Sequence, residues 1–187
     1  MSWMPQFEIG LWNAWWFMLI YPLQWLLVII LPKRIVERTS HAPEINRTRQ
    51  DKIMAFLTQG FWIGATLYSI FLPFQSGTIM FWIGLIFFLT GLIVLILATV
   101  AVANTPADKP FSSGVYRISR HPMYLSMILV YLGVSIAAAS WLFLLITIIT
   151  FFLQRYQARK EENYCCEKFG EVYRVYMYRT ARWIGIP

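Results

Sequence analysis

The sequence predicts an all-α integral membrane protein with about five transmembrane helices. Three observations lead to this fold class: the composition, the lengths of the apolar segments and the placement of the basic residues. Of the 187 residues, 58% are hydrophobic and only 13% are charged, whereas a soluble domain carries about 25% charged residues. This apolar excess is larger than a soluble core needs, so we expect lipid around much of the chain.

Five apolar segments account for the expected membrane helices. They cover residues 11–31, 56–74, 78–103, 123–138 and 141–156. The first begins with a cluster of tryptophans that suits the membrane interface. The second and third are joined by the turn at 75–77 and form a hairpin, whereas the fourth and fifth are short for full spans. Small residues allow close helix contact in membranes, and the candidates are Gly60, Gly64, Gly84 and Gly91.

The basic residues fix an expected orientation. All 16 of them lie in the loop after the first segment, the loop after the third segment or the C-terminal region. Because basic residues collect on the cytoplasmic side, five spans place the N-terminus outside and the C-terminus in the cytoplasm. No basic patch with interleaved aromatic residues lies outside these loops, which argues against a nucleic-acid-binding protein.

The chain divides into two expected regions. Residues 1–103 form N-terminal transmembrane helices, and residues 104–187 form a helical hairpin with a polar C-terminal tail. Pro122 suits the first position of a helix, where its missing N–H is not needed, and a further helix is expected over 160–169. The adjacent pair Cys165 and Cys166 is expected to stay as free thiols, because neighbouring cysteines bridge only with strain.

Polar groups gather where the fourth segment begins and the fifth ends. Residues 114–124 hold Arg120 and His121 with two tyrosines, and Glu161 and Glu162 follow the fifth segment. Each has a plain structural explanation: His121 can cap a helix, Arg120 can reach lipid headgroups, and the glutamates can form a solvated helix face. Together, however, they are polar groups at a membrane edge, where such groups mark functional sites.

This grouping suits a ligand with a cationic, amino-bearing end. Carboxylates can bind an ammonium group, and aromatic faces attract a sulfonium. Methyl transfer from a sulfonium needs mainly alignment and exclusion of water. The residues therefore make methyl transfer plausible without identifying it.

Motifs in the same region resemble a known superfamily. They are Gly114-Val115-Tyr116, Arg120-His121-Pro122-Met123-Tyr124, Glu161-Glu162, Phe169-Gly170-Glu171-Val172-Tyr173 with Tyr176, and Arg182 with Pro187. In this order and spacing, residues 104–187 resemble the isoprenylcysteine carboxyl methyltransferase and phospholipid methyltransferase superfamily. The resemblance implies an S-adenosyl-L-methionine site open to the cytoplasm, reached by a lipophilic or small methyl acceptor from the lipid bilayer.

The resemblance also implies roles for individual residues. The implied catalytic residues are Arg120, His121 and Glu161. The implied cofactor-binding residues are Phe111, Gly114, Tyr116, His121, Tyr124, Glu161 and Glu162. The implied substrate-binding residues are Arg155, Gln157 and Arg159. No metal and no nucleic acid is expected.

Two positions depart from the family pattern. Where many members have a His-x-Leu-Val segment, this chain has Asp108-Lys109-Pro110-Phe111. Members that act on prenylated cysteine tend to carry an arginine four residues before the first glutamate of the pair, and this chain has Gln157 there. The second departure argues against a carboxylate acceptor such as isoprenylcysteine. A phospholipid amine, a small thiol or another lipophilic acceptor stays open.

Two other classes compete with a methyltransferase. An NADPH-dependent sterol or steroid reductase has a similar C-terminal region, but it tends to place an acidic residue soon after the Arg-His-Pro-x-Tyr motif, and none follows Tyr124 here. A non-catalytic membrane scaffold is the third possibility. Measured cofactor binding would distinguish the methyltransferase, the reductase and the scaffold.

Overall fold

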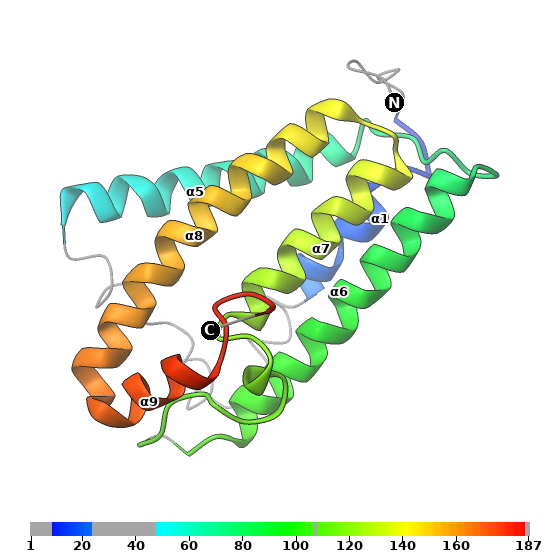
Figure 1. Cartoon of the computed structure of the whole chain (residues 1–187). Coiled ribbons are helices and arrows are strands. Elements are labelled where there is room, and N and C mark those ends of the chain that lie inside the picture. Colours follow the sequence, from blue (N-terminus) through cyan, green and yellow to red (C-terminus); the bar gives the residue numbers. More distant parts are fainter. Residues whose placement is uncertain (1–8, 24–47, 107, 186–187) are drawn as a thin grey trace.

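The computed structural model describes residues 9–23, 48–106 and 108–185, and within these ranges the fold is helical and contains no strand (Figure 1). The elements are α1 (Trp15–Met18), α5 (Arg49–Ser69), α6 (Ile79–Asn104), the 3-10 helix η1 (Gly114–Arg117), α7 (Pro122–Ala137), α8 (Trp141–Phe169) and α9 (Glu171–Arg179). Figure 1 shows α6 and α7 running side by side and α8 following a similar direction, while α5 crosses α8. The all-α fold class is thereby confirmed for the described residues.

Two of these helices are long and apolar enough to cross a membrane: α6 and α8. The apolar helix α7 is shorter. The segments expected over 78–103 and 123–138 coincide with α6 and α7 to within one residue at each end. Of the segment expected over 11–31, residues 24–31 lie outside the described residues. The count of five spans and the side of the membrane for each terminus stay predictions.

Three helix boundaries differ from the sequence expectation. Helix α5 begins at Arg49, seven residues before the expected start, because Thr48 and Asp51 form a capping box that begins the helix within the charged loop. Helix α8 continues through residue 156 and includes the separate helix expected over 160–169. The helix is capped by Gly170, whose positive φ of 57° is a backbone conformation that glycine adopts readily. Helix α9 then follows within what was expected to be a polar tail.

Glycines let α6 and α7 approach closely, as expected for Gly84 and Gly91. A Cβ atom built on Gly84 would lie 2.5 Å from the backbone nitrogen of Ala137, and one on Gly91 would lie 2.9 Å from the carbonyl oxygen of Ser126. Gly133 of α7 contacts the backbone of α6 in the same way. At Gly60 and Gly64 an added Cβ would meet no described atom within 4 Å, so their contacts stay a prediction.

A polar contact joins α5 to α8. The carboxylate of Asp51, in the first turn of α5, is 1% exposed. It accepts a hydrogen bond from the hydroxyl of Tyr156 at 2.6 Å and forms an ion pair with Nζ of Lys160 at 2.9 Å. Hydrogen bonds from Tyr156, Thr48 and Lys160 lower the pKa of Asp51. This contact fixes the polar end of α8 against the start of α5.

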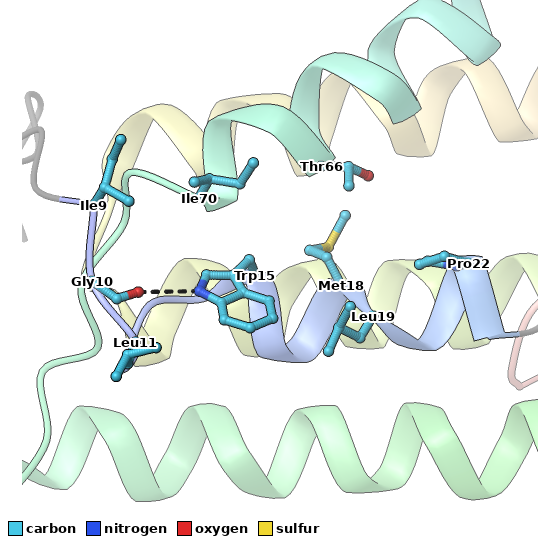
Figure 2. Close-up of a pocket in the computed structure, with 9 residues that line it drawn as sticks. All are labelled: Ile9, Gly10, Leu11, Trp15, Met18, Leu19, Pro22, Thr66 and Ile70. Atoms are coloured by element: carbon cyan, nitrogen blue, oxygen red, sulfur yellow. Dashed lines mark hydrogen bonds between the residues drawn. The ribbon is translucent and has the colours of Figure 1, made fainter.

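A cavity of about 450 Å³ lies between α1 and α5 (Figure 2). Its lining is almost wholly apolar, with one hydrogen bond, from Nε1 of Trp15 to the carbonyl oxygen of Gly10 at 3.2 Å. The nearby chain after α5 reaches the end of α7, since the N–H of Gln75 donates to the carbonyl of Ala137. The cavity therefore lies toward the C-terminal end of α7, whereas His121 lies at the start of that helix. The cavity places no polar group beside His121.

Candidate functional site

Four segments meet at the start of α7: η1, the first turn of α7, the polar end of α8 and the segment that follows α9. Pro122 occupies the first turn of α7 and His121 is the residue before it, as the sequence predicts. Helices α7 and α8 are joined by a short bend, so the start of α7 lies beside the part of α8 that carries Glu161 and Glu162 (Figure 1). This arrangement brings residues about 40 positions apart in the sequence into contact.

His121 is held between two carboxylates. Its Nδ1 lies 3.3 Å from Oε2 of Glu161, and its Nε2 lies 3.2 Å from Oε1 of Glu162. The side chain is buried, and its ring stacks on Tyr124 with the centroids 5.5 Å apart. Burial disfavours the charged ring, but the hydrogen bonds and charges of the two glutamates outweigh it and raise the pKa of His121.

Glu162 is the centre of a buried ion network. Its Oε1 accepts from Nε of Arg120 at 3.0 Å and from Nε of Arg182 at 2.9 Å, besides its contact with His121. Its Oε2 accepts from a terminal nitrogen of Arg182 at 2.5 Å. The side chain is 4% exposed. Because both of its oxygens are occupied by protein donors, Glu162 can hold neighbouring residues in place more readily than it can bind a ligand.

Glu161 has a different environment from Glu162. Its side chain is 35% exposed. Besides His121, its neighbour is Tyr124, whose hydroxyl donates to Oε1 of Glu161. Glu161 is therefore the accessible carboxylate of the pair, held in position by an imidazole and a phenol.

The segment after α9 folds back onto the start of α7. The guanidinium of Arg120 donates to the carbonyl oxygens of Met177 at 2.7 Å and Thr180 at 2.9 Å, and its backbone N–H donates to Ala181 at 2.9 Å. The hydroxyl of Ser119 donates to the carbonyl of Arg182 at 3.0 Å. These bonds hold the C-terminal segment beside His121.

Trp183, carried by that segment, lies at the border of the site. Its ring is 6.2 Å from that of His121 and 5.5 Å from that of Phe151, measured between centroids. Phe151 belongs to the apolar part of α8. Trp183 therefore connects the charged cluster to the apolar part of α8.

The 3-10 helix η1 forms the opposite border. It begins at Gly114, whose φ of 58° is a conformation that glycine adopts readily. Tyr116 is buried, packs against Phe111 with ring centroids 5.7 Å apart, and accepts a hydrogen bond on its carbonyl from the hydroxyl of Tyr176 at 2.6 Å. Burial, followed by the negative charge of Glu161, raises the pKa of Tyr116.

The structure thus brings together most of the residues singled out in the sequence. Contacts join Arg120, His121, Tyr124, Glu161 and Glu162 to one another. Tyr116 lies in η1, which begins at Gly114, and its ring packs against Phe111. The three residues expected to bind substrate are not part of this group. Arg155 and Arg159 are exposed and Gln157 is partly exposed. Among the described residues, no side-chain hydrogen bond or ion pair joins them to His121 or Glu161.

Two residues of the cluster were not assigned roles from the sequence. In the sequence Arg182 appears only as part of a motif, and no pattern marks Trp183 as a site residue. The reason is that no local sequence feature predicts the return of the C-terminal segment to the start of α7. Among the described residues, no group of three His, Cys, Asp or Glu side chains is arranged to hold a metal ion. Cys165 and Cys166 are free thiols.

The apolar helices and this charged cluster at their border are features of a membrane-bound enzyme, and a family comparison gives the class. The model of the phospholipid methyltransferase family matches residues 72–172, more than half of the chain. The chain belongs to this family of membrane methyltransferases, within the isoprenylcysteine and phospholipid methyltransferase superfamily. Comparisons with curated proteins and with solved structures found no match.

Proposed function

We propose that the protein is an S-adenosyl-L-methionine-dependent methyltransferase whose cofactor site is the cluster around His121 and Glu161. The observation that carries the proposal is the partly exposed carboxylate of Glu161, fixed by His121 and Tyr124 beyond the apolar part of α8 in a methyltransferase-family chain. When bound, the cofactor supplies an electrophilic methyl group on a sulfonium. An acceptor would take that methyl group as the carbon–sulfur bond breaks with its electron pair on sulfur, and a proton carried by the acceptor atom would pass to the solvent.

The residues present fit such a cofactor. The carboxylate of Glu161 suits the ammonium of an amino-acid moiety. The faces of Tyr124 and Trp183 suit a sulfonium by cation–π attraction, which is worth about 0.5–2 kcal/mol. Gly114 leaves the backbone open to close approach, since it carries no side chain. Phe111 and Tyr116 supply an apolar wall that excludes water.

His121 and Arg120 have positioning roles in this proposal. The imidazole keeps its proton, because both of its ring nitrogens face carboxylates, and it orients Glu161 instead of removing a proton from the acceptor. Arg120 and Glu162 hold the tail that carries Trp183. Methyl transfer from a sulfonium depends on alignment and a dry site, which a fixed framework of this kind can provide. We further propose that the site opens to the cytoplasm, on the side where the basic residues collect.

The test is calorimetric binding of S-adenosylhomocysteine to the detergent-purified protein, with NADPH titrated in parallel. Glu161→Gln is expected to weaken S-adenosylhomocysteine binding about 10- to 100-fold, because a charge-assisted hydrogen bond contributes about 1.5–3 kcal/mol. Glu171→Gln is the matched control, because Glu171 is an exposed carboxylate of the same polar region, in α9, and its removal should leave the affinity unchanged. Binding of NADPH alone would assign the protein to the reductase class, and binding of neither would favour a scaffold.

A further inference from the structure

The face of α8 that meets α7 carries polar side chains well beyond the charged cluster. At one end, Glu161 contacts Tyr124 of α7. At the other, Thr147 contacts the hydroxyl of Ser135 of α7 at 3.1 Å and also donates to the carbonyl of Phe143. Both ends of this row are therefore satisfied by protein partners.

The middle of the row is different. Gln154 and Thr150 lie four residues apart, so they share one face of the helix, and they are 4% and 2% exposed. Neither Oε1 of Gln154 nor Oγ1 of Thr150 has a hydrogen-bond partner among the described residues. A buried polar atom without a hydrogen-bond partner destabilises the folded protein. These two atoms belong to one face of α8, between satisfied neighbours, and mark a place where a ligand atom would complete the bonding.

The orientation of the Gln154 amide is set by α7. Its Nε2 donates to Sδ of Met127 at 3.0 Å. The reversed amide would place an oxygen lone pair against the thioether sulfur, which is itself only a weak acceptor. Oε1 is therefore the atom left free, and it can only accept a hydrogen bond.

This position lies where an acceptor from the bilayer would approach the proposed cofactor site. Gln154 stands seven residues before Glu161, about two helical turns toward the apolar part of α8. It is also three residues after Phe151, whose ring contacts Trp183 beside His121, and residues three apart are neighbours on a helix surface. The free oxygen thus lies between the lipid-facing part of α8 and the charged cluster.

Resting on the proposed methyltransferase function, we propose that Gln154 is a specificity-determining residue that accepts a hydrogen bond from the methyl acceptor, with the hydroxyl of Thr150 beside it. The acceptor class is then a lipophilic molecule whose nucleophilic atom carries hydrogen: an amine, an alcohol or a thiol. A carboxylate acceptor is disfavoured, because Oε1 repels it. The nearest cations of this stretch of α8, Arg155 and Arg159, are exposed on its surface.

The test uses four probes with the same twelve-carbon chain: dodecylamine, dodecanol, dodecanethiol and dodecanoic acid. Transfer of a labelled methyl group from S-adenosyl-L-methionine is measured with the full-length protein in detergent. At least one of the first three should be methylated, and dodecanoic acid should not. Gln154→Met, which keeps the side-chain length and removes the oxygen, should raise KM for that acceptor about 3- to 10-fold with a smaller change in kcat, as expected for one hydrogen bond.

Two further variants separate a binding role from a structural one. Thr150→Val removes an unpartnered hydroxyl, so it should raise KM without lowering the melting temperature. Thr147→Val is the control, because that hydroxyl already has partners, and it should leave KM for the acceptor unchanged.

The outcomes also separate this inference from the proposed function. If S-adenosylhomocysteine binds the wild type and Gln154→Met equally and KM for the methyl acceptor is unchanged, the role of Gln154 is overturned. The methyltransferase assignment would still stand. Methylation of dodecanoic acid, or of none of the probes by a protein that binds S-adenosylhomocysteine, would also overturn it. If S-adenosylhomocysteine does not bind at all, the proposed methyltransferase function is overturned, and the role of Gln154 that rests on it falls with it.

Discussion

His121 and Glu162 are joined across α7 and α8 by a contact of 3.2 Å between Nε2 and Oε1, while the other ring nitrogen faces Glu161 at 3.3 Å. Glu161 and Glu162 are consecutive on one helix, so their side chains leave it about 100° apart and reach the ring at different nitrogens. A neutral imidazole has one N–H and can satisfy only one of these carboxylates. The geometry therefore favours the protonated ring.

This relationship predicts a pH dependence of stability. The pKa of His121 is raised in the folded state, so its contribution is fully present below the unfolded value of about 6.5. It is lost as the pH rises through the folded pKa. We expect the melting temperature in detergent to fall across that window. The groups that face the ring are Glu161, Glu162 and Tyr124.

The control for this pH dependence is His121→Gln, which removes the titrating ring. The alkaline decline in melting temperature should be absent or much smaller in that variant. A decline of the same size in both proteins would show that another group is responsible.

Glu161 and Glu162 should respond differently to the same substitution. Glu162→Gln removes the charge that pairs with Arg120, Arg182 and His121, and breaking a buried network of this kind costs about 3 kcal/mol or more. Glu161→Gln affects a side chain that is 35% exposed, and its cost in stability should be under about 1 kcal/mol. Thermal unfolding of the two variants, beside S-adenosylhomocysteine binding, measures both effects. Equal melting temperatures would contradict the central role of Glu162.

Arg182 should hold the tail in place. Its guanidinium makes two contacts with Glu162, and those hydrogen bonds are the main cause of its raised pKa. Arg182→Met is expected to cost about 2 kcal/mol, less than loss of Glu162 because Arg120 and His121 remain as partners. Limited proteolysis should cut the C-terminal segment faster in this variant.

The matched control for Arg182 is Arg174→Met. Arg174 is 63% exposed and makes only a 3.9 Å pair with Glu171 in the same helix, so its loss should change neither stability nor the rate of cleavage. If both variants were cleaved at the same rate, the Arg182–Glu162 contact would not be what holds the tail.

Sequence patterns could predict the helices and the core of the site, but not the return of the tail. Helices α6 and α7 follow from apolar length and from local signals such as Pro122 at the first turn. The meeting of His121 with Glu161 follows from two antiparallel helices joined by a short bend. Trp183, by contrast, is brought to His121 by the hydrogen bonds of Arg120 with carbonyl groups about 60 residues away in the sequence. Every residue has a backbone carbonyl, so the sequence does not show which carbonyl groups accept these bonds.

The glycines of α6 give the last prediction, because they test how closely the helices that position the site must pack. In Gly84→Ala the new Cβ would lie 2.5 Å from a backbone nitrogen and 2.6 Å from a carbonyl oxygen of α7. Backbone atoms cannot move aside as a flexible side chain can, so the two helices must separate. We expect a loss of about 1–3 kcal/mol, seen as a lower melting temperature. Gly60→Ala in α5 is the matched control: its Cβ would meet no described atom within 4 Å, and alanine is the better helix former by about 1 kcal/mol, so its melting temperature should hold or rise. A lower melting temperature for Gly60→Ala than for Gly84→Ala would mean that α5, not the α6–α7 pair, is the closely packed helix.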